Sequence, residues 1–157
     1  MAIEIEHKYL VVNDSYKQDA SSHSEIWQGY LSRDPAHTIR VRIRDSSACI
    51  TIKGKSAGAA RCEFEYSIPL EDAQQLMQLC EPPIISKTRY IIMHDGNRWE
   101  VDEFHGALSG LVIAELEIPD EKYRYRLPAF VGNDVTNDKR FYNSQLGLSS
   151  EQLDKMK

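Results

Sequence analysis

Several segments of the chain carry charged residues at alternate positions, and within each segment the charges have one sign. Side chains two positions apart on an extended strand point to the same face, so each segment would form a row of like charges. Neighbouring charges in a row, about 7 Å apart, repel by about 0.6 kcal/mol in water and about 2 kcal/mol at an effective dielectric near 20. The rows therefore need counter-charges. The acidic rows are Glu4 and Glu6, Glu63 and Glu65, Glu100 and Asp102, and Glu115 and Glu117; the basic rows are Arg40, Arg42 and Arg44, and Lys87 and Arg89.

Two arrangements would supply these counter-charges. In the first, acidic and basic rows pair across neighbouring strands and form a salt-bridged sheet with no chemical role. In the second, the carboxylates bind hard cations, and the basic rows bind a polyanion whose phosphates touch the same cations. A triphosphate carries about four negative charges, which about five or six Lys and Arg side chains and two metal ions would neutralise. The second arrangement predicts hydrolysis by a metal-ordered water, without a nucleophilic side chain.

Other polar features of the sequence give weaker signals. The five histidines are scattered and lack the spacing of a zinc site. The three cysteines are odd in number and are interpreted as small hydrophobic residues. Residues 54–58 resemble a phosphate-binding loop only superficially, because the Gly-Lys-Ser/Thr ending is missing. Arg124 and Arg126 alternate with tyrosines, which is weak evidence for binding of single-stranded nucleic acid.

Composition places the chain among ordinary globular proteins. Its 157 residues are 41% apolar and 27% charged, and we expect one domain spanning residues 1–157. No segment approaches the roughly 20 apolar residues of a membrane helix, and the N-terminus is acidic where a secretory signal would be basic. We therefore expect a cytoplasmic location and no membrane partner. The net charge of −5 argues against a nucleic-acid partner.

Alternation of apolar and polar residues is the dominant pattern along the chain. It predicts eight strands joined by mostly short turns, which favours antiparallel pairing. An eight-stranded antiparallel sheet can remove its edges by closing into a barrel, with side chains filling the interior. The expected strands are at about 2–11, 23–31, 37–45, 48–54, 61–69, 84–94, 97–104 and 110–119.

A few helices are expected beside this barrel, which makes the fold α+β but mainly β. An amphipathic helix follows Pro69 and is stopped by Pro82 and Pro83. Short helical pieces are expected at 128–131, before Gly132, and at about 138–146, with a last helix at 150–157. These helices are too few to cover the outside of a barrel, and a homodimer would cover more of it.

The order of short motifs along the chain resembles one known superfamily. The N-terminal Glu-x-Glu-x-Lys, residues 4–8, is similar to the signature of the CYTH, or triphosphate tunnel metalloenzyme, superfamily. The chain resembles its short bacterial inorganic tripolyphosphatases most closely. The resemblance implies an eight-stranded tunnel that holds triphosphate, with Mg²⁺ or Mn²⁺ bound by acidic residues. The later motifs, in order, are Gln28-Gly29-Tyr30-Leu31, Arg40-Val41-Arg42, Thr51-Ile52-Lys53-Gly54, Glu63-Phe64-Glu65-Tyr66, Lys87-Thr88-Arg89-Tyr90, Trp99-Glu100-Val101-Asp102 and Ala114-Glu115-Leu116-Glu117.

The same resemblance assigns expected roles to individual residues. Lys8 and Tyr30 match a Lys-Tyr pair beside the reactive phosphate, and Lys139 or Arg140 would add a basic group from the C-terminal segment. The expected phosphate ligands are Lys8, Arg40, Arg42, Lys53, Lys87 and Arg89. The expected metal-site carboxylates are Glu4, Glu6, Asp102, Glu115 and Glu117, with Glu63 and Glu65 as a further acidic pair.

The superfamily also includes proteins with other substrates, so the fold does not choose among them. We expect hydrolysis of inorganic tripolyphosphate to pyrophosphate and phosphate, because no insertion would plainly build an adenine or thiamine pocket. The alternatives are an adenylate cyclase of the class IV type, a thiamine or nucleoside triphosphatase, and an enzyme for longer polyphosphate. A further alternative is a binding module for polyphosphate or nucleotide that does not catalyse.

Overall fold

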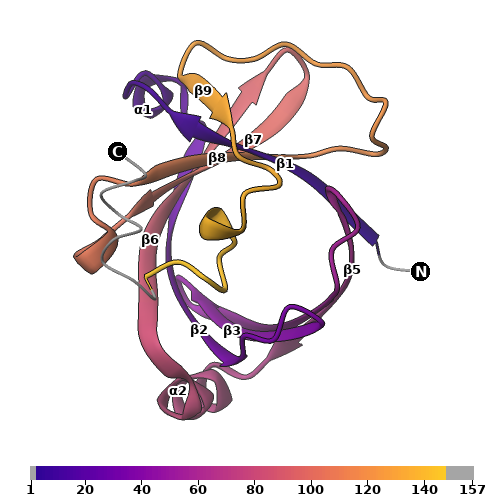
Figure 1. The fold of residues 1–157 in the computed structure, drawn as a ribbon. Helices are drawn as coiled ribbons and strands as arrows, with labels where there is room; N and C mark the ends of the chain where they lie inside the picture. Colours follow the sequence, from indigo (N-terminus) through magenta and orange to yellow (C-terminus); the bar gives the residue numbers. More distant parts are fainter. Residues whose placement is uncertain (1–2, 148–157) are drawn as a thin grey trace.

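The computed structural model describes residues 3–147, and eight of its strands close into an antiparallel barrel (Figure 1). The strands follow the order β5-β4-β3-β2-β6-β7-β8-β1, and β1 returns to pair with β5. The predicted eight-stranded barrel is confirmed. Its strands are β1 (Ile3–Val11), β2 (Ser22–Ser32), β3 (His37–Arg44), β4 (Ser47–Gly54), β5 (Ala60–Ile68), β6 (Glu81–His94), β7 (Asn97–Phe104) and β8 (Val112–Glu117).

Strand β1 forms the seam of the barrel because it pairs with three other strands. Its first residues, Ile3 to Ile5, pair with β5, and Glu6 to Leu10 pair with β8. Its last residues pair with a short ninth strand, β9 (Val131–Asp134). The backbone groups of β1 are thus satisfied along its length, as a strand in a closed sheet requires.

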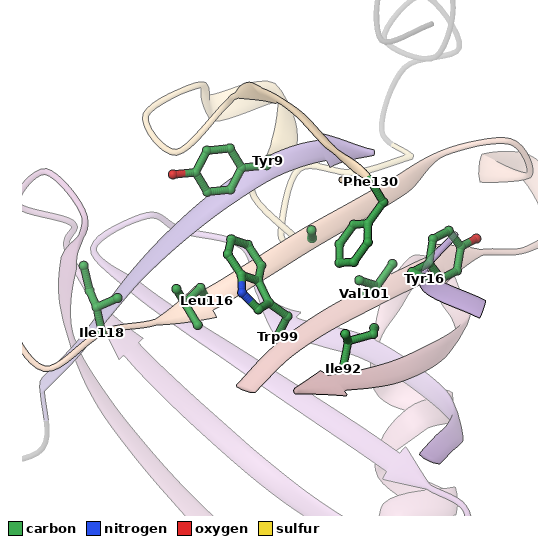
Figure 2. Packing of buried hydrophobic residues seen from close by; sticks show 9 residues of the cluster. Tyr9, Tyr16, Ile92, Trp99, Val101, Leu116, Ile118 and Phe130 are labelled. Atoms are coloured by element: carbon green, nitrogen blue, oxygen red, sulfur yellow. The ribbon is translucent and has the colours of Figure 1, made fainter. Parts of the chain in front are cut away.

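The barrel carries its charged rows inside and its apolar rows outside, the reverse of an ordinary globular core. Outside β1, β7 and β8, an aromatic and aliphatic cluster forms where the chain crosses back over the sheet at Phe130 (Figure 2). Trp99 lies at its centre, in contact distance of Tyr9 and Phe130 with ring centroids 5.8 and 6.5 Å away. This cluster fixes the outward row of β7, and with it the inward row that alternates with it.

Helix α2 (Leu70–Leu79) covers another part of the outside. Its Ala73 packs with Val41 of β3 and Ala48 of β4, which are buried beneath the helix. Figure 1 shows α2 outside the ring of strands, beside β2 and β3. The predicted helix between Pro69 and Pro82 is therefore present. Strand β6, however, begins at Glu81 and runs through both prolines, three residues earlier than residue 84, where the sequence placed it.

One end of the barrel is closed from within by the C-terminal segment. The inner rows turn apolar toward this end, where Leu10, Ile85, Phe104 and Ile113 continue the rows of charged residues. Phe141 and Leu146 are packed against these side chains, and a 3₁₀ turn, η2 (Lys139–Phe141), lies within the ring of strands in Figure 1. The C-terminal segment is thus an internal plug.

The structure corrects the helices predicted near the C-terminus. Residues 128–131 form a single turn, closed by the Val131 amide donating to the Pro128 carbonyl at 3.1 Å, and not a helix. From Val131 the chain pairs with β1 as β9 and satisfies backbone groups of β1. The helix predicted at about 138–146 is reduced to η2, where the Asp138 side chain accepts from the Arg140 amide. Two short turns, α1 (Tyr16–Asp19) and η1 (Gly106–Leu108), were not predicted. The helix expected at 150–157 lies outside the described residues.

Among residues 3–147, no helix has the length and apolar character needed to cross a membrane.

The two tryptophans give a matched test of this packing. Trp99 is fully buried, with 0% of its surface exposed, whereas Trp27 on the outside of β2 is 54% exposed. We expect Trp99→Ala to lower the free energy of unfolding by about 3–5 kcal/mol because it empties the centre of the cluster. Trp27→Ala should cost less than about 1 kcal/mol. Denaturant titration measures both, and equal losses would contradict the position of the cluster.

Candidate functional site

The inner rows of the barrel line a strongly charged cavity. Its wall consists of charged side chains from β1, β3, β4, β5, β6, β7 and β8, with one amide from the C-terminal segment. The lining residues are Glu4, Glu6, Arg40, Arg42, Arg44, Lys53, Glu63, Glu65, Arg89, Arg98, Glu100, Glu115, Glu117 and Asn143. The tunnel expected from the resemblance thus has charged walls of both signs.

A second cavity shares part of this wall and reaches toward the plug. Glu4, Glu6, Arg40, Lys53 and Asn143 line both cavities. The second one adds two residues expected to act together, Lys8 and Tyr30, and polar groups of the C-terminal segment. The predicted metal-site carboxylates, the predicted phosphate ligands and Tyr30 all line one of the two cavities except Lys87 and Asp102, which are fully buried behind the wall.

The β3 arginines have polar partners but no acidic ones. Arg40 donates to the Thr51 hydroxyl at 3.1 Å, and Arg42 donates from Nε and Nη2 to the Gln28 amide oxygen at 3.1 and 2.8 Å. Arg44 donates to the Ser24 hydroxyl at 3.2 Å. Across residues 3–147, no carboxylate oxygen lies within 4.0 Å of these three guanidinium groups. The row therefore presents positive charge to the cavity without a direct ion pair.

Burial makes the charged form of Arg42 less stable, and a bound anion would stabilise it. Desolvation lowers the pKa of Arg42 to about 9, and the neighbouring charges of Arg40 and Arg89 lower it further in the same direction. Gln28 is fully buried and orients Arg42, a role that the sequence analysis did not assign. Its position two residues before Tyr30, on the same face of β2, was the available signal.

The carboxylates of β1, β5 and β8 crowd one another on the other side of the cavity. Burial, followed by the charges of Glu115 and Glu4, raises the pKa of Glu6 well above its usual range. Burial and the hydrogen bond with Glu4 raise the pKa of Glu63 to about 7. Burial, followed by the charges of Glu4 and Glu100, raises the pKa of Glu117. Such groups are stabilised by protons or by bound cations.

These carboxylates fit a metal ion that shares its coordination with a ligand. In the described part of the chain, no three His, Cys, Asp or Glu side chains converge closely enough to hold a metal by themselves. Mg²⁺ in phosphate-processing sites is commonly held by one or two carboxylates together with substrate phosphates. The crowded pairs, such as Glu6 opposite Glu117 in the β1–β8 register, supply the protein share of such a site.

Some cations of the lumen are already paired with acids. Lys53 lies 2.7 Å from Glu4 and 3.6 Å from Glu63, and Lys8 lies 3.6 Å from Glu115. Lys8 also donates to the carbonyl oxygen of Phe141 at 3.1 Å, so the plug helps to orient it. The salt-bridged arrangement considered first therefore holds for part of the barrel interior but leaves the β3 row without carboxylate partners.

Two other expectations concern the second cavity. Tyr30 is buried on its wall, and the Arg33 guanidinium lies 5.6 Å from the centre of the Tyr30 ring, which restrains the ring. Neither Lys139 nor Arg140 lines either of these two cavities, and Arg140 is paired with Asp138 on the surface. The C-terminal segment instead contributes Asn143 and the Phe141 carbonyl group.

A closed barrel in which arginines without carboxylate partners face crowded carboxylates defines a tunnel-type protein with a charged interior. Its family follows from comparison with known proteins: the CYTH domain matches residues 2–154, and the chain belongs to this family. An inorganic triphosphatase from Acetivibrio thermocellus is 44% identical over 147 residues, which cover 93% of this chain and 94% of that protein. The predicted family is confirmed.

Two further comparisons agree with this result. An inorganic triphosphatase from Nitrosomonas europaea is 34% identical over 152 residues, covering 93% of this chain and 97% of that protein. The crystal structure of the inorganic triphosphatase NE1496 superposes with a TM-score of 0.68 at 32% identity, covering 95% of this chain and 97% of that chain. The barrel described above is therefore shared with a solved structure over nearly its whole length.

The raised carboxyl pKa values predict how metal binding depends on pH. Glu6, Glu63 and Glu117 retain protons at higher pH than ordinary glutamates, and for Glu63 this extends to about pH 7. Because a bound metal must displace these protons, its affinity should increase as the pH rises through 7. We expect the Mn²⁺ affinity to be about tenfold higher at pH 8 than at pH 6, which corresponds to about 1.4 kcal/mol. Mn²⁺ in excess should therefore raise the Tm by about 3 °C more at pH 8 than at pH 6.

Thermal melts with and without Mn²⁺ at each pH measure this difference, and the metal-free melts serve as the control. A metal-induced rise that is equal at both pH values, or larger at pH 6, would contradict the assignment of these carboxylates.

Proposed function

We propose that the protein hydrolyses inorganic tripolyphosphate to pyrophosphate and phosphate in a reaction that depends on Mg²⁺ or Mn²⁺. The observation that carries this proposal is the β3 row, where Arg40, Arg42 and Arg44 face the cavity without carboxylate partners. A linear polyanion satisfies such a row, since charge-assisted hydrogen bonds to phosphate are strong and guanidinium groups match phosphate geometry. The two relatives named inorganic triphosphatase support the choice of substrate.

The basic side chains of the lumen would hold the phosphate groups. Arg40 and Arg42 contribute from β3, Lys53 from β4 and Lys8 from β1, all on the cavity walls. Their charge stabilises the negative charge that shifts onto the phosphate oxygens as the terminal phosphoryl group is transferred. Lys8 and Tyr30, in the second cavity, would lie beside the reacting phosphate.

The carboxylates would hold the metal. When bound, a divalent metal neutralises phosphate charge and lowers the pKa of a coordinated water. The residues that support this role line the main cavity: Glu4, Glu6, Glu63, Glu65, Glu115 and Glu117. In the reaction, the water oxygen would form a bond to the terminal phosphorus while the bridging P–O bond breaks. Pyrophosphate would leave with the bonding electron pair, and the proton lost by the water would pass to solvent. The plug, by closing one end of the barrel, limits the access of other water.

A substrate panel tests the proposal. Tripolyphosphate, ATP, thiamine triphosphate and long polyphosphate are each incubated with Mg²⁺ or Mn²⁺, and phosphate, pyrophosphate and cyclic AMP are quantified. We expect the highest kcat/KM for tripolyphosphate, with pyrophosphate and phosphate released in equal amounts. Formation of cyclic AMP from ATP without hydrolysis of tripolyphosphate would point to a cyclase. Tight binding of tripolyphosphate without turnover would point to a binding module.

Separate substitutions should separate phosphate binding from metal binding. Arg42→Ala removes charge-assisted hydrogen bonds worth about 1.5–3 kcal/mol, so KM for tripolyphosphate should rise about ten- to a hundredfold. Glu117→Gln should instead raise the metal concentration needed for half-maximal activity. Arg126→Ala, whose side chain is exposed outside the barrel, is the matched arginine control and should change neither quantity. The same change in KM from Arg42→Ala and Arg126→Ala would contradict the assignment.

A cytoplasmic location, the absence of nucleic-acid and membrane partners, and a homodimer remain predictions from the sequence. The exposed side chains Ile3, Phe64 and Tyr66 on the outside of β1 and β5 are consistent with pairing of two copies. Light scattering on the purified protein measures its mass, and a monomer at micromolar concentration would contradict the homodimer.

A further inference from the structure

Strand β7 contributes two carboxylates to the inner rows of the barrel, and their surroundings differ. Asp102 has 0% of its surface exposed and lines neither cavity. Glu100, two residues earlier on the same face, lines the main cavity and keeps 20% of its side chain exposed. Only one of the two is therefore accessible to a bound ion.

Both oxygens of Asp102 are occupied by cationic side chains. Arg89 donates from Nε to Oδ1 at 2.7 Å and from Nη2 to Oδ2 at 2.8 Å. Lys87 donates from Nζ to Oδ2 at 2.7 Å, and this lysine is also fully buried. Charge-assisted and bidentate contacts of this length are among the strongest polar interactions in proteins. A metal ion at Asp102 would have to displace two buried cations.

Glu100 shares Arg89 with Asp102, but its second cationic partner is exposed. It forms ion pairs with Arg89 at 2.6 Å and with Arg98 at 3.5 Å, the second of these with a half-exposed side chain. In the β7–β8 register Glu100 stands directly opposite Glu115, so their Cα atoms are about 4.5–5.5 Å apart. A carboxylate offers about four lone-pair directions, and two ion pairs leave some of them facing the cavity.

We propose that Glu100 is the metal-facing carboxylate of β7, and that Asp102 is a positioning residue that fixes Lys87 and Arg89 on the wall of the tunnel. The proposal rests on the proposed function, because the metal and the polyanion are those of the triphosphatase reaction. It reassigns Asp102, which the sequence analysis placed among the metal ligands. The two residues share a face and a charge, so only their contacts distinguish them.

The binding of Mn²⁺ alone tests the assignment of Glu100. Free Mn²⁺ is titrated by electron paramagnetic resonance against the unmodified full chain and three variants that each remove one β7 charge. We expect Glu100→Gln to weaken Mn²⁺ binding at least tenfold. Asp102→Asn should change it less than about threefold, as should the control Glu103→Gln, whose carboxylate contacts Tyr16 and Lys17 outside the barrel. Unchanged binding in Glu100→Gln overturns the proposal, as does a loss in Asp102→Asn of tenfold or more.

Asp102→Asn leaves two buried cations without their counter-ion and is the variant most at risk of not folding. Glu100→Gln does not carry this risk, because the side chain is partly exposed, and its Mn²⁺ affinity alone decides for or against the first half of the proposal. Because this titration uses no substrate, it stays informative even if tripolyphosphate is not hydrolysed. Failure of hydrolysis would count against the proposed function and not against the assignment of Glu100.

A double-mutant cycle tests the positioning role of Asp102. If Asp102 acts through Arg89, the loss of kcat/KM caused by Asp102→Asn at saturating Mn²⁺ should be at least tenfold smaller in the Arg89→Gln background than in the unmodified protein. Equal losses in both backgrounds would show that Asp102 acts independently of Arg89 and would overturn this half of the proposal.

Discussion

The structure depends on one constraint: rows of like charge are enclosed inside the barrel. Closing the sheet turns the polar rows inward, where screening by water is reduced and like charges repel more strongly. The protein compensates some of this charge internally, as in the pairs Lys53–Glu4 and Arg89–Asp102. It leaves Arg40 and Arg42 without acids and Glu6 with a raised pKa. The remaining imbalance is what a polyanion and divalent cations would relieve.

The apolar parts of the fold support this charged interior from both sides. Outside, the Trp99 cluster holds the row that alternates with the β7 carboxylates. Inside, Phe141 and Leu146 close one end against Phe104 and Ile113. The Phe141 carbonyl of the same segment accepts a hydrogen bond from Lys8. The segment that closes the barrel therefore also orients a site residue. A lumen open at fewer places also strengthens the electrostatic interactions inside it.

Most of the barrel could be predicted from the sequence because alternation over long segments fixes both strand and face. The plug could not, since residues 128–147 carry short mixed patterns whose structure depends on contacts with β1 and the inner rows. Within the barrel, alternation identified the rows that face inward. It could not separate Glu100 from Asp102, or reveal that Gln28 orients Arg42, because these distinctions come from burial and neighbours across the barrel.

We infer that a triphosphate and metal ions together balance the charges that the protein leaves unpaired inside the barrel. The most direct measurement is a crystal structure of the protein with Mn²⁺ and a non-hydrolysable imido analogue of tripolyphosphate, with anomalous scattering used to locate the metal. We expect phosphate groups in contact with Arg40 and Arg42, and an anomalous peak between those phosphates and the glutamates of β1 and β8. An analogue bound outside the barrel, or a metal peak away from these glutamates, would contradict this inference.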